Sequence, residues 1–280
     1  MYDETKEKLL TLRETIREMG RVLIAYSGGM DSTFLAKLSL DCLGKENVLL
    51  VTARSPFFPE REIKDAEKTA RFLGADHIII EHNELEVEAI VENSLERCYH
   101  CKRELFEKLL KMATKFKKEY VLDGTTKDDE GDFRPGIRAL RELGIRSPLS
   151  ECGLTKREIK ALSEEMNLPT QNKPSFACLA SRFPYGQRIT EEKLRMVNTA
   201  EELLLEMGFR VVRVRHYGEL ARIEVGEDEI NRFMSSELRK KVVESLKGLG
   251  YVYVTLDLRG FRSGSMNEAI KYGGGNGRVR

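Results

Sequence analysis

The stretch SGGMDS, residues 27–32, decides the fold of this chain. It follows an apolar run at 22–26, which is short enough for a buried parallel strand, and it precedes a run at 33–38 whose apolar residues have helical spacing. Two glycines let the backbone approach a ligand closely, while serine hydroxyls and the N–H groups of the new helix point to one place. The junction therefore predicts a cradle for phosphate, but not a Walker A loop, because no Gly-Lys-Ser/Thr follows.

Strands and helices continue to alternate on both sides of this junction. Further strands are predicted at 48–52, 77–80 and 120–124, and helices at 4–19, 59–73, 84–96 and 102–118. This order predicts an α/β fold with a doubly wound parallel sheet. In such a sheet, ligands bind outside the carboxyl ends of the strands, where the phosphate cradle lies.

A second, smaller α+β domain is predicted in the C-terminal third of the chain. A proline-containing linker at 169–185 precedes it, so we expect one domain at 1–185 and the smaller one, for substrate binding or oligomerisation, at 186–270. Its predicted elements are a helix at 190–207, strands at 210–216 and 220–225, a helix at 227–247 and a strand at 251–256. The glycine-rich end, 271–280, is predicted to be a flexible tail.

Composition narrows the classes of function. The chain has 280 residues and a formal net charge of only +1, which argues against a nucleic-acid partner, since such proteins usually carry an excess of Lys and Arg. The N-terminus lacks an apolar signal region and no apolar run reaches membrane-spanning length, so we expect a cytoplasmic protein without a membrane partner. Five cysteines in a reducing compartment favour metal binding or catalysis over disulfides.

Three of the cysteines have a setting that suggests chemistry. Cys98 and Cys101 form a C-x-x-C pair, which shares one face if it is helical. Cys178 lies in the linker near Lys173 and Arg182, whose positive charge would favour a thiolate, although a small buried hydrophobic residue fits the same position. The remaining two, Cys42 and Cys152, are expected to be structural.

The SGGMDS junction resembles the PP-loop of the ATP pyrophosphatases, which have an adenine nucleotide hydrolase-like fold. Five more motifs follow in order: GTTKDD at 124–129 with FRPG at 133–136, SPL at 147–149 with GLTK at 153–156, and CLASRFPYG at 178–186. Together they resemble the LarE family of ATP-dependent sulfur transferases, and the similarity covers nearly all of the chain. The cysteine motif is far more specific than the PP-loop alone.

The resemblance implies a reaction. Members of this family adenylate a carboxylate of pyridinium-3,5-biscarboxylic acid mononucleotide with ATP and Mg²⁺ and convert it to a thiocarboxylate during biosynthesis of the nickel-pincer nucleotide. The residue that matches Cys178 delivers the sulfur. The implied partners are other proteins of nickel-pincer cofactor biosynthesis, and a homo-oligomer is expected.

Two sulfur sources are implied by the resemblance. Members with a single cysteine give up its own sulfur and end with dehydroalanine. Others carry three cysteines and a [4Fe–4S] cluster whose iron without a protein ligand can hold sulfide. Because Cys98, Cys101 and Cys178 are all present, we expect the three-cysteine, cluster-bearing type, with these three residues as metal ligands.

The candidate site residues follow from the motifs and the resemblance. The catalytic candidates are Cys178, Asp31 and Ser32, and the nucleotide- and substrate-binding candidates are Ser27, Gly28, Gly29, Asp31, Ser32, Thr52, Ala53, Gly124, Arg213 and Arg215. Arg213 and Arg215 share one strand face and suit a phosphate or carboxylate, or else form ion pairs on a solvated face. Weaker candidates for metal or substrate contacts are Glu201, Glu224 and Asp228, while Asp128, Asp129 and Asp132 either bind Mg²⁺ or form a solvated acidic loop. Three histidines, His77, His82 and His216, have no ligand spacing and are expected in the core or at the surface.

Three alternatives remain open from the sequence. A PP-loop tRNA thiolation enzyme also adenylates its substrate, but the near-neutral charge disfavours it. An ammonia-dependent PP-loop ligase shares the loop but has no need of Cys178. A nucleotide sensor without catalysis would leave both the loop and the cysteines without a role.

Overall fold

The computed structural model describes residues 2–130, 135–174, 176–262 and 264–268. The chain forms two compact units. The first contains residues 1–90 and 94–176, and the second contains 91–93 and 177–280. The units therefore divide after Phe176, earlier in the chain than the boundary predicted at residue 185, and the second unit also takes a short segment from the middle of the first.

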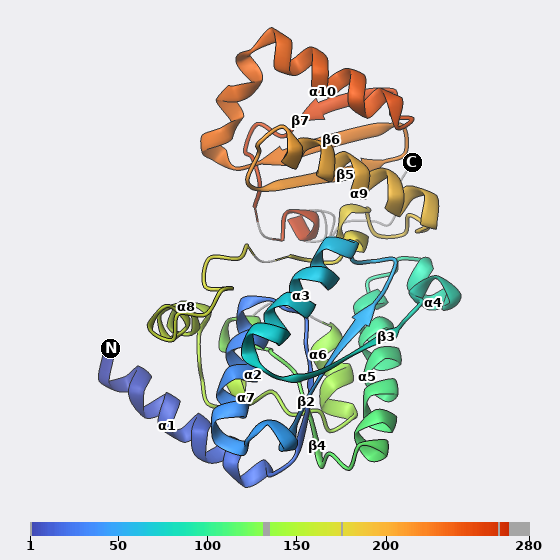
Figure 1. Cartoon of the computed structure of the whole chain (residues 1–280). Coiled ribbons are helices and arrows are strands. Elements are labelled where there is room, and N and C mark those ends of the chain that lie inside the picture. Colours follow the sequence, from blue (N-terminus) through green and yellow to red (C-terminus); the bar gives the residue numbers. More distant parts are fainter. Residues whose placement is uncertain (1, 131–134, 175, 263, 269–280) are drawn as a thin grey trace. The chain divides into compact units, whose positions relative to one another are not determined.

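The first unit is built on a four-stranded parallel sheet in the order β3-β2-β1-β4 (Figure 1). Its strands are β1 (Val22–Ala25), β2 (Val48–Arg54), β3 (Asp76–Glu81) and β4 (Tyr120–Leu122). Because β1 lies between β2 and β4, the chain leaves it in one direction and returns on its other side, as a doubly wound sheet requires. The predicted α/β fold and all four strands are confirmed.

Alternate residues of the central strands pack into two different cores. Val22 and Ile24 of β1 join a core with α1, α2, α3 and α8, whereas Leu23, between them, packs with α5 and α6. The helices are α1 (Tyr2–Met19), α2 (Met30–Leu43), α3 (Glu60–Leu73), α4 (Glu88–Val91), α5 (Arg97–Lys115), α6 (Pro135–Glu142), α7 (Pro148–Glu151) and α8 (Lys156–Glu165). Short 3₁₀ turns are η1 (Lys45–Asn47), η2 (Glu84–Glu86) and η3 (Lys127–Asp129). Both faces of the sheet are thus covered by helices, which explains the continuous apolar character of the strands.

One predicted helix is wrong. Residues 84–96 form only the turn η2 and the short helix α4, and the next helix, α5, already begins at Arg97. Asn93 has a positive φ of 55° and is fully buried, so the backbone leaves helical geometry there. The C-x-x-C pair consequently lies in the first turns of α5, where Cys98 and Cys101 are helical as the shared-face interpretation requires.

The SGGMDS turn lies against α3. Gly28 has a φ of +67°, and a Cβ atom on it would stand 2.7 Å from the Cα atom of Ala66. Both the backbone conformation and the lack of space require glycine at this position. The turn is thus held between β1, α2 and α3 by steric fit.

The second unit is a small α+β domain, as predicted. Its sheet has the order β5-β6-β7, with β5 (Val212–Tyr217) antiparallel to β6 (Leu220–Val225) and β7 (Tyr253–Leu256) parallel to β6. Helices α9 (Glu191–Glu206) and α10 (Ser236–Gly248) pack on it, around a core that includes Leu204, Val214 and Leu246. The 3₁₀ segments are η4 (Leu179–Arg182), η5 (Glu227–Met234) and η6 (Ser265–Asn267). The helix predicted at 227–247 is therefore divided at Ser235, whose side chain caps α10.

The segment 91–93 is anchored in the second unit by hydrogen bonds. The Ile189 amide donates to the Val91 carbonyl, and the Gly186 amide donates to the Asn93 carbonyl. The Asn93 side chain donates to the Pro184 carbonyl at 2.7 Å. These bonds tie a piece of the chain from between α4 and α5 to the motif at 178–186.

No helix in the described ranges combines the length and apolar character needed to cross a membrane. The predicted flexible tail at 271–280 lies outside the described residues.

We predict that Gly28→Ala destabilises the protein by about 2–4 kcal/mol, because it adds both left-handed strain and a clash with Ala66. The matched control is Gly74→Ala. Gly74 also has a positive φ, 68°, but a Cβ there would meet nothing within 4 Å, so a loss of about 1–2 kcal/mol is expected. Urea denaturation followed by circular dichroism measures both. Equal losses in the two variants would contradict the close contact with α3.

Candidate functional site

The SGGMDS turn is organised by its two serines. The Ser27 and Ser32 hydroxyls are 3.0 Å apart, the Gly29 amide donates to Ser27 Oγ, and Ser32 Oγ donates to the Gly29 carbonyl. Gly29 is the N-cap of α2 and forms no side-chain cap. The positive end of the helix dipole is therefore not neutralised by a capping side chain and is suited to an anion.

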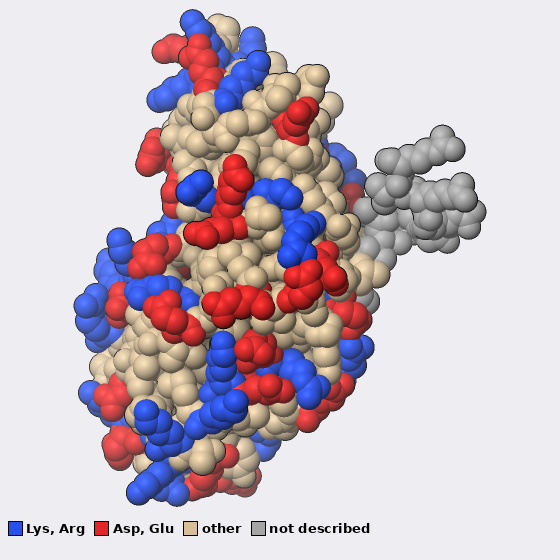
Figure 2. All heavy atoms as spheres, turned by 90° about the vertical axis from the view of Figure 1, so that its right-hand side faces the viewer, with Lys and Arg blue, Asp and Glu red and all other residues tan. Residues whose placement is uncertain are grey.

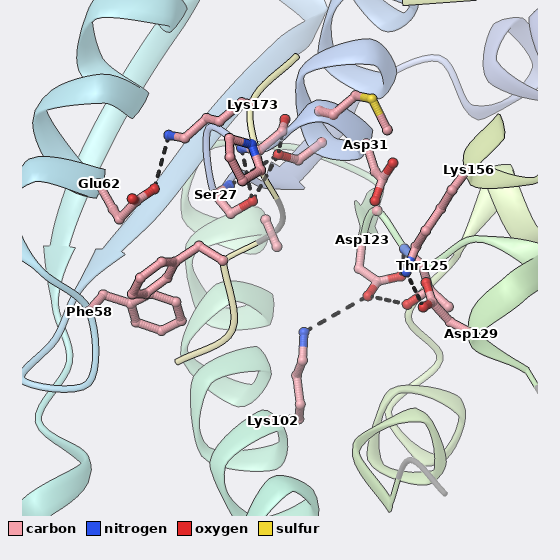
Figure 3. A pocket seen from close by; sticks show the side chains of 17 residues that line it. Ser27, Asp31, Phe58, Glu62, Lys102, Asp123, Thr125, Asp129, Lys156 and Lys173 are labelled. Atoms are coloured by element: carbon pink, nitrogen blue, oxygen red, sulfur yellow. Dashed lines mark hydrogen bonds and ion pairs between the residues drawn. The ribbon is translucent and has the colours of Figure 1, made fainter. Parts of the chain in front are cut away.

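A cavity of about 380 Å³ opens next to this turn (Figure 3). Among its lining residues are three lysines from separate segments: Lys102 on α5, Lys156 at the start of α8 and Lys173 after α8. Four carboxylates, of Asp31, Glu62, Asp123 and Asp129, line the cavity as well, so the ammonium groups beside the helix N-terminus offer directed contacts to an anion and not an excess of positive charge.

Each of these lysines is held by a carboxylate. Lys173 Nζ lies 2.9 Å from a Glu62 oxygen, and Lys156 Nζ lies 2.8 Å from an Asp129 oxygen. Lys102 Nζ is 3.9 Å from Asp123, which is a long contact for an ion pair. Figure 3 shows these side chains converging from different elements. The pairs fix the ammonium groups around the cavity before a ligand binds.

The acidic residues near the cavity form different contacts. Asp123, directly after β4, accepts hydrogen bonds from Thr125 and Ser147, while Asp129 closes a capping box with Thr126. Asp128 accepts from the Lys156 amide. Asp31 lies in the first turn of α2 and lines the cavity. Asp123, Asp128 and Asp129 thus shape the loop after β4, whereas Asp31 stands beside the phosphate cradle.

Two aromatic rings line the same cavity. The ring centroids of Phe58, after β2, and Phe176, at the end of the first unit, are 6.3 Å apart. The Arg61 guanidinium carbon lies 5.8 Å from the centre of the Phe176 ring. Such rings suit the flat face of a nucleotide base.

The predicted nucleotide-binding residues fall into two groups. Ser27, Gly29, Asp31, Ser32 and Gly124 line the cavity. Gly124 comes so close to α2 that a Cβ on it would be 3.3 Å from the Ser32 amide nitrogen.

The other three predicted residues are outside the cavity lining. Gly28 packs on α3 instead, and Ala53 lies within β2. Thr52 is buried, donates to the Tyr26 carbonyl and lies 2.8 Å from Nε2 of the half-buried His77.

The C-x-x-C pair has neighbours that the sequence did not indicate. The Arg97 guanidinium donates to Cys98 Sγ at 3.5 Å. Cys101 Sγ belongs to a cluster with His82, which follows β3, and Glu84 of η2, whose ligand atoms all lie within 4.8 Å of one another. Burial lowers the pKa of His82 to about 4 and raises the pKa of Glu84. His82 is thus a buried histidine, but one that faces a thiol and a carboxyl group.

Cys178 is in the second unit, at the N-cap of η4, and is half-buried. Arg182 holds its backbone. This arginine is completely buried, donates to the Ala177 and Cys178 carbonyls and forms a two-pronged ion pair with Glu201 of α9. Glu201, a weak candidate for metal or substrate contact, is instead the buried partner of Arg182.

Arg213 and Arg215 share one face of the β5–β6 hairpin, as predicted. Arg213 is opposite Glu224 and Arg215 is opposite Arg222. The face is not solvated, since Arg213 is 8% and Arg215 4% exposed. Arg215 pairs with Glu224 at 2.7 Å, while burial and the neighbouring Arg182 lower the pKa of Arg213 to about 10.

The two buried arginines have different partners. Arg213 donates to the Val212 carbonyl and lies over the Phe261 ring. Arg215 is committed to Glu224, Ser181 and Ser265. The other weak candidate in this unit, Asp228, forms an exposed pair with Arg210. The two arginines therefore differ in their surroundings, with Arg213 against an aromatic ring and Arg215 in an ion pair with Glu224.

Several residues of the cavity carried no predicted role. Lys156 lies in the GLTK motif, Lys173 is predicted only to place positive charge near Cys178, and Lys102 directly follows Cys101, but nothing in their spacing indicates that they meet. Phe58 follows the second strand, close to where PP-loop proteins bind adenine. Its position in the sequence could therefore have indicated a role in nucleotide binding. His82 lacks ligand spacing because its partners come from different elements.

Comparison with known proteins gives consistent matches. A family model described as a family of unknown function (DUF7411) matches residues 20–182. An uncharacterized protein of Synechocystis is 42% identical over 95% of this chain and 98% of its own length. The pyridinium-3,5-bisthiocarboxylic acid mononucleotide synthase of Lactiplantibacillus plantarum is 39% identical over 94% of this chain and 95% of its own. An uncharacterized protein of Methanocaldococcus jannaschii is 30% identical over 92% of this chain and 98% of its own.

We predict that Arg182→Ala destabilises the second unit by about 3–5 kcal/mol, because it leaves the Glu201 carboxylate buried without its partner. The control is Lys240→Ala, whose pair with Glu244 is 77% exposed on the lysine and 67% on the glutamate and whose loss should lie within the error of the measurement. Chemical denaturation compares them. Similar midpoints for Arg182→Ala and the parent protein would show that the pair does not hold the Cys178 segment.

Proposed function

Because this chain belongs to the LarE family of pyridinium-3,5-bisthiocarboxylic acid mononucleotide synthases, we propose that it is an ATP-dependent sulfur transferase in nickel-pincer nucleotide biosynthesis. Its substrate is pyridinium-3,5-biscarboxylic acid mononucleotide, and its product is the thiocarboxylate. The observation that carries this proposal is the cavity beside the SGGMDS turn, which combines a helix N-terminus, three lysines and two phenylalanines.

We propose that ATP binds in this cavity. The N-terminus of α2 and the Ser27 and Ser32 hydroxyls bind the β- and γ-phosphates. Lys156 and Lys173 neutralise the remaining phosphate charge, and Phe58 and Phe176 contact the base. The α-phosphorus is then left for attack from the open side of the cavity.

Asp31 suits Mg²⁺ on the triphosphate. Hard cations prefer carboxylate oxygens, and Asp31 is the acidic residue in the first turn of α2, next to the bound phosphates. When bound, Mg²⁺ neutralises charge on the pyrophosphate leaving group.

The first chemical step activates the substrate carboxylate. A carboxylate oxygen attacks the α-phosphorus of ATP, and the bond between that phosphorus and the oxygen of pyrophosphate breaks. The lysines and the helix N-terminus stabilise the departing pyrophosphate, and the substrate becomes an acyl adenylate. AMP is now a far better leaving group than oxide.

The second step forms the carbon–sulfur bond. A sulfur nucleophile attacks the acyl carbon, and the bond to AMP breaks. If the nucleophile is the Cys178 thiolate, the resulting thioester loses the Cα proton of residue 178 and its Cβ–S bond breaks. This leaves the thiocarboxylate and dehydroalanine. Arg182, which donates to the Cys178 carbonyl, is the positioning residue for this segment.

The three cysteines fit the cluster-bearing type. Cys98 and Cys101 are one turn apart at the start of α5, and none of the described cysteines forms a disulfide. With Cys178 they offer three thiolates for a [4Fe–4S] cluster, which when bound supplies sulfide as the sulfur source. Cys178 then holds the cluster and is not consumed.

A small anionic substrate suits the charge of the molecule. The net charge is +1, and on the face shown in Figure 2 the basic and acidic side chains are interspersed. Binding to the phosphate backbone of RNA favours a concentrated basic area instead. Arg213, buried and with a lowered pKa, is proposed to meet the phosphate of the substrate mononucleotide, with Arg215 beside it.

We predict that Lys156→Ala and Lys173→Ala each weaken ATP binding about 10-fold or more, because each removes a charge-assisted contact to phosphate. Isothermal titration calorimetry measures the Kd. The control is Lys160→Ala, also on α8, whose exposed lysine pairs with Glu164. Unchanged affinity in both variants, or pyrophosphate release that does not require the pyridinium substrate, would contradict the proposed use of the cavity.

We predict that anaerobically reconstituted protein retains its polypeptide mass after turnover and requires sulfide for repeated cycles. Mass spectrometry of the intact protein tests this. Loss of the elements of H₂S at residue 178 would instead establish sacrifice of Cys178 and overturn the cluster route, while leaving the adenylation step intact. Cys42→Ser and Cys152→Ser are controls that should turn over like the parent protein.

A further inference from the structure

The cluster formed by His82, Glu84 and Cys101 lies at the carboxyl end of β3, where α5 packs beside the sheet (Figure 1). His82 is 2% and Glu84 1% exposed. His82 Nε2 has no hydrogen-bond partner among the described residues and lies 3.8 Å from Glu84 Oε1. A buried polar atom without a hydrogen bond is costly, so its placement requires an explanation.

We propose that His82, Glu84 and Cys101 form a mononuclear site for a divalent transition metal of the zinc type. Imidazole nitrogen, carboxylate oxygen and thiolate sulfur together suit a borderline-soft ion such as Zn²⁺ or Co²⁺. Their ligand atoms lie within 4.8 Å of one another, so a modest shortening of these distances brings the three atoms to three corners of one coordination tetrahedron. Three protein ligands leave the fourth position for water or another small ligand.

A second layer of contacts orients the carboxylate. Ser55, at the end of β2, donates to Glu84 Oε2 at 2.5 Å, and this leaves Oε1, the oxygen nearer His82, for the metal. Metal ligands are commonly oriented in this way by hydrogen bonds from outside the first coordination sphere.

Lys108 sets the state of the metal-free site. Its Nζ lies 3.2 Å from His82 Nδ1, and a charged ammonium can only donate, so the imidazole proton is on Nε2. Metal binding at Nε2 requires that this proton leave and that Lys108 turn away. Its 40% exposed side chain can do so, because it also pairs with Glu104. The contact between Lys108 and His82 therefore lowers the affinity of the site for a metal ion.

The site goes beyond the sulfur-transfer proposal and competes with it for one residue. A Cys101 thiolate bound to Zn²⁺ is not available to an iron–sulfur cluster. If the proposed function is correct, the mononuclear site therefore exists only in protein that lacks the cluster.

The test uses the full-length protein, stripped of metal by a chelator under reducing, anaerobic conditions, and Co²⁺ as the probe. We expect one equivalent to bind with a thiolate-to-cobalt charge-transfer band. Cys101→Ser should abolish the band, and His82→Ala should weaken binding about 100-fold. Lys108→Gln should tighten binding several-fold, a result that a merely structural role for the cluster does not produce.

The controls are His100→Ala, which neighbours Cys101 in sequence, and Cys152→Ser, which removes a thiol elsewhere in the first unit; both residues lie outside the cluster, and both variants should bind Co²⁺ like the parent protein. If circular dichroism shows that His82→Ala does not fold, Glu84→Gln, which can keep the Ser55 contact, takes its place with Lys108→Gln. Absence of the band in the parent protein, or equal Co²⁺ affinity in the His82 or Glu84 variant, would overturn the proposal.

Discussion

The site depends on a steric constraint, the contact between the turn after β1 and helix α3. Residue 28 can carry no side chain because a Cβ there would stand 2.7 Å from the Ala66 backbone. This contact fixes where α2 begins, and so where the positive end of its dipole lies. Gly124, after β4, closes on the same helix start from the neighbouring strand. The lysines are then arranged around an anion position that backbone packing has already determined.

In the second unit, a buried ion pair holds the segment that carries Cys178. Arg182 donates two hydrogen bonds to Glu201 away from solvent, and it also donates to the backbone of the Cys178 segment. Glu201 further accepts from the Val214 amide of β5. A single carboxylate thus connects α9, the hairpin with the arginines and the cysteine segment. This explains the arginine of the CLASR motif as a structural support for the cysteine.

The sequence was sufficient for whatever depends on local pattern. The strand ends, the glycine turn and the β5–β6 hairpin all follow from residues close together in the chain. The helix expected at 84–96 failed because buried Asn93 binds a distant carbonyl, a tertiary contact that overrides propensity. Lys102, Lys156 and Lys173 could not be grouped, since they converge only after folding, and the same holds for His82 and Cys101.

Residues 91–93 belong to the second unit but lie in sequence between the two parts of the first, so no single cut in the chain separates the units. Because this segment supplies backbone partners to Gly186 and Ile189, a fragment starting at Ala177 lacks part of its own architecture. Recombination between relatives at one crossover point would combine a segment from one parent with a motif from another. The second unit, which contains Cys178, is therefore expected to evolve together with the first unit. Exchange of either unit alone between relatives is expected to disrupt these hydrogen bonds.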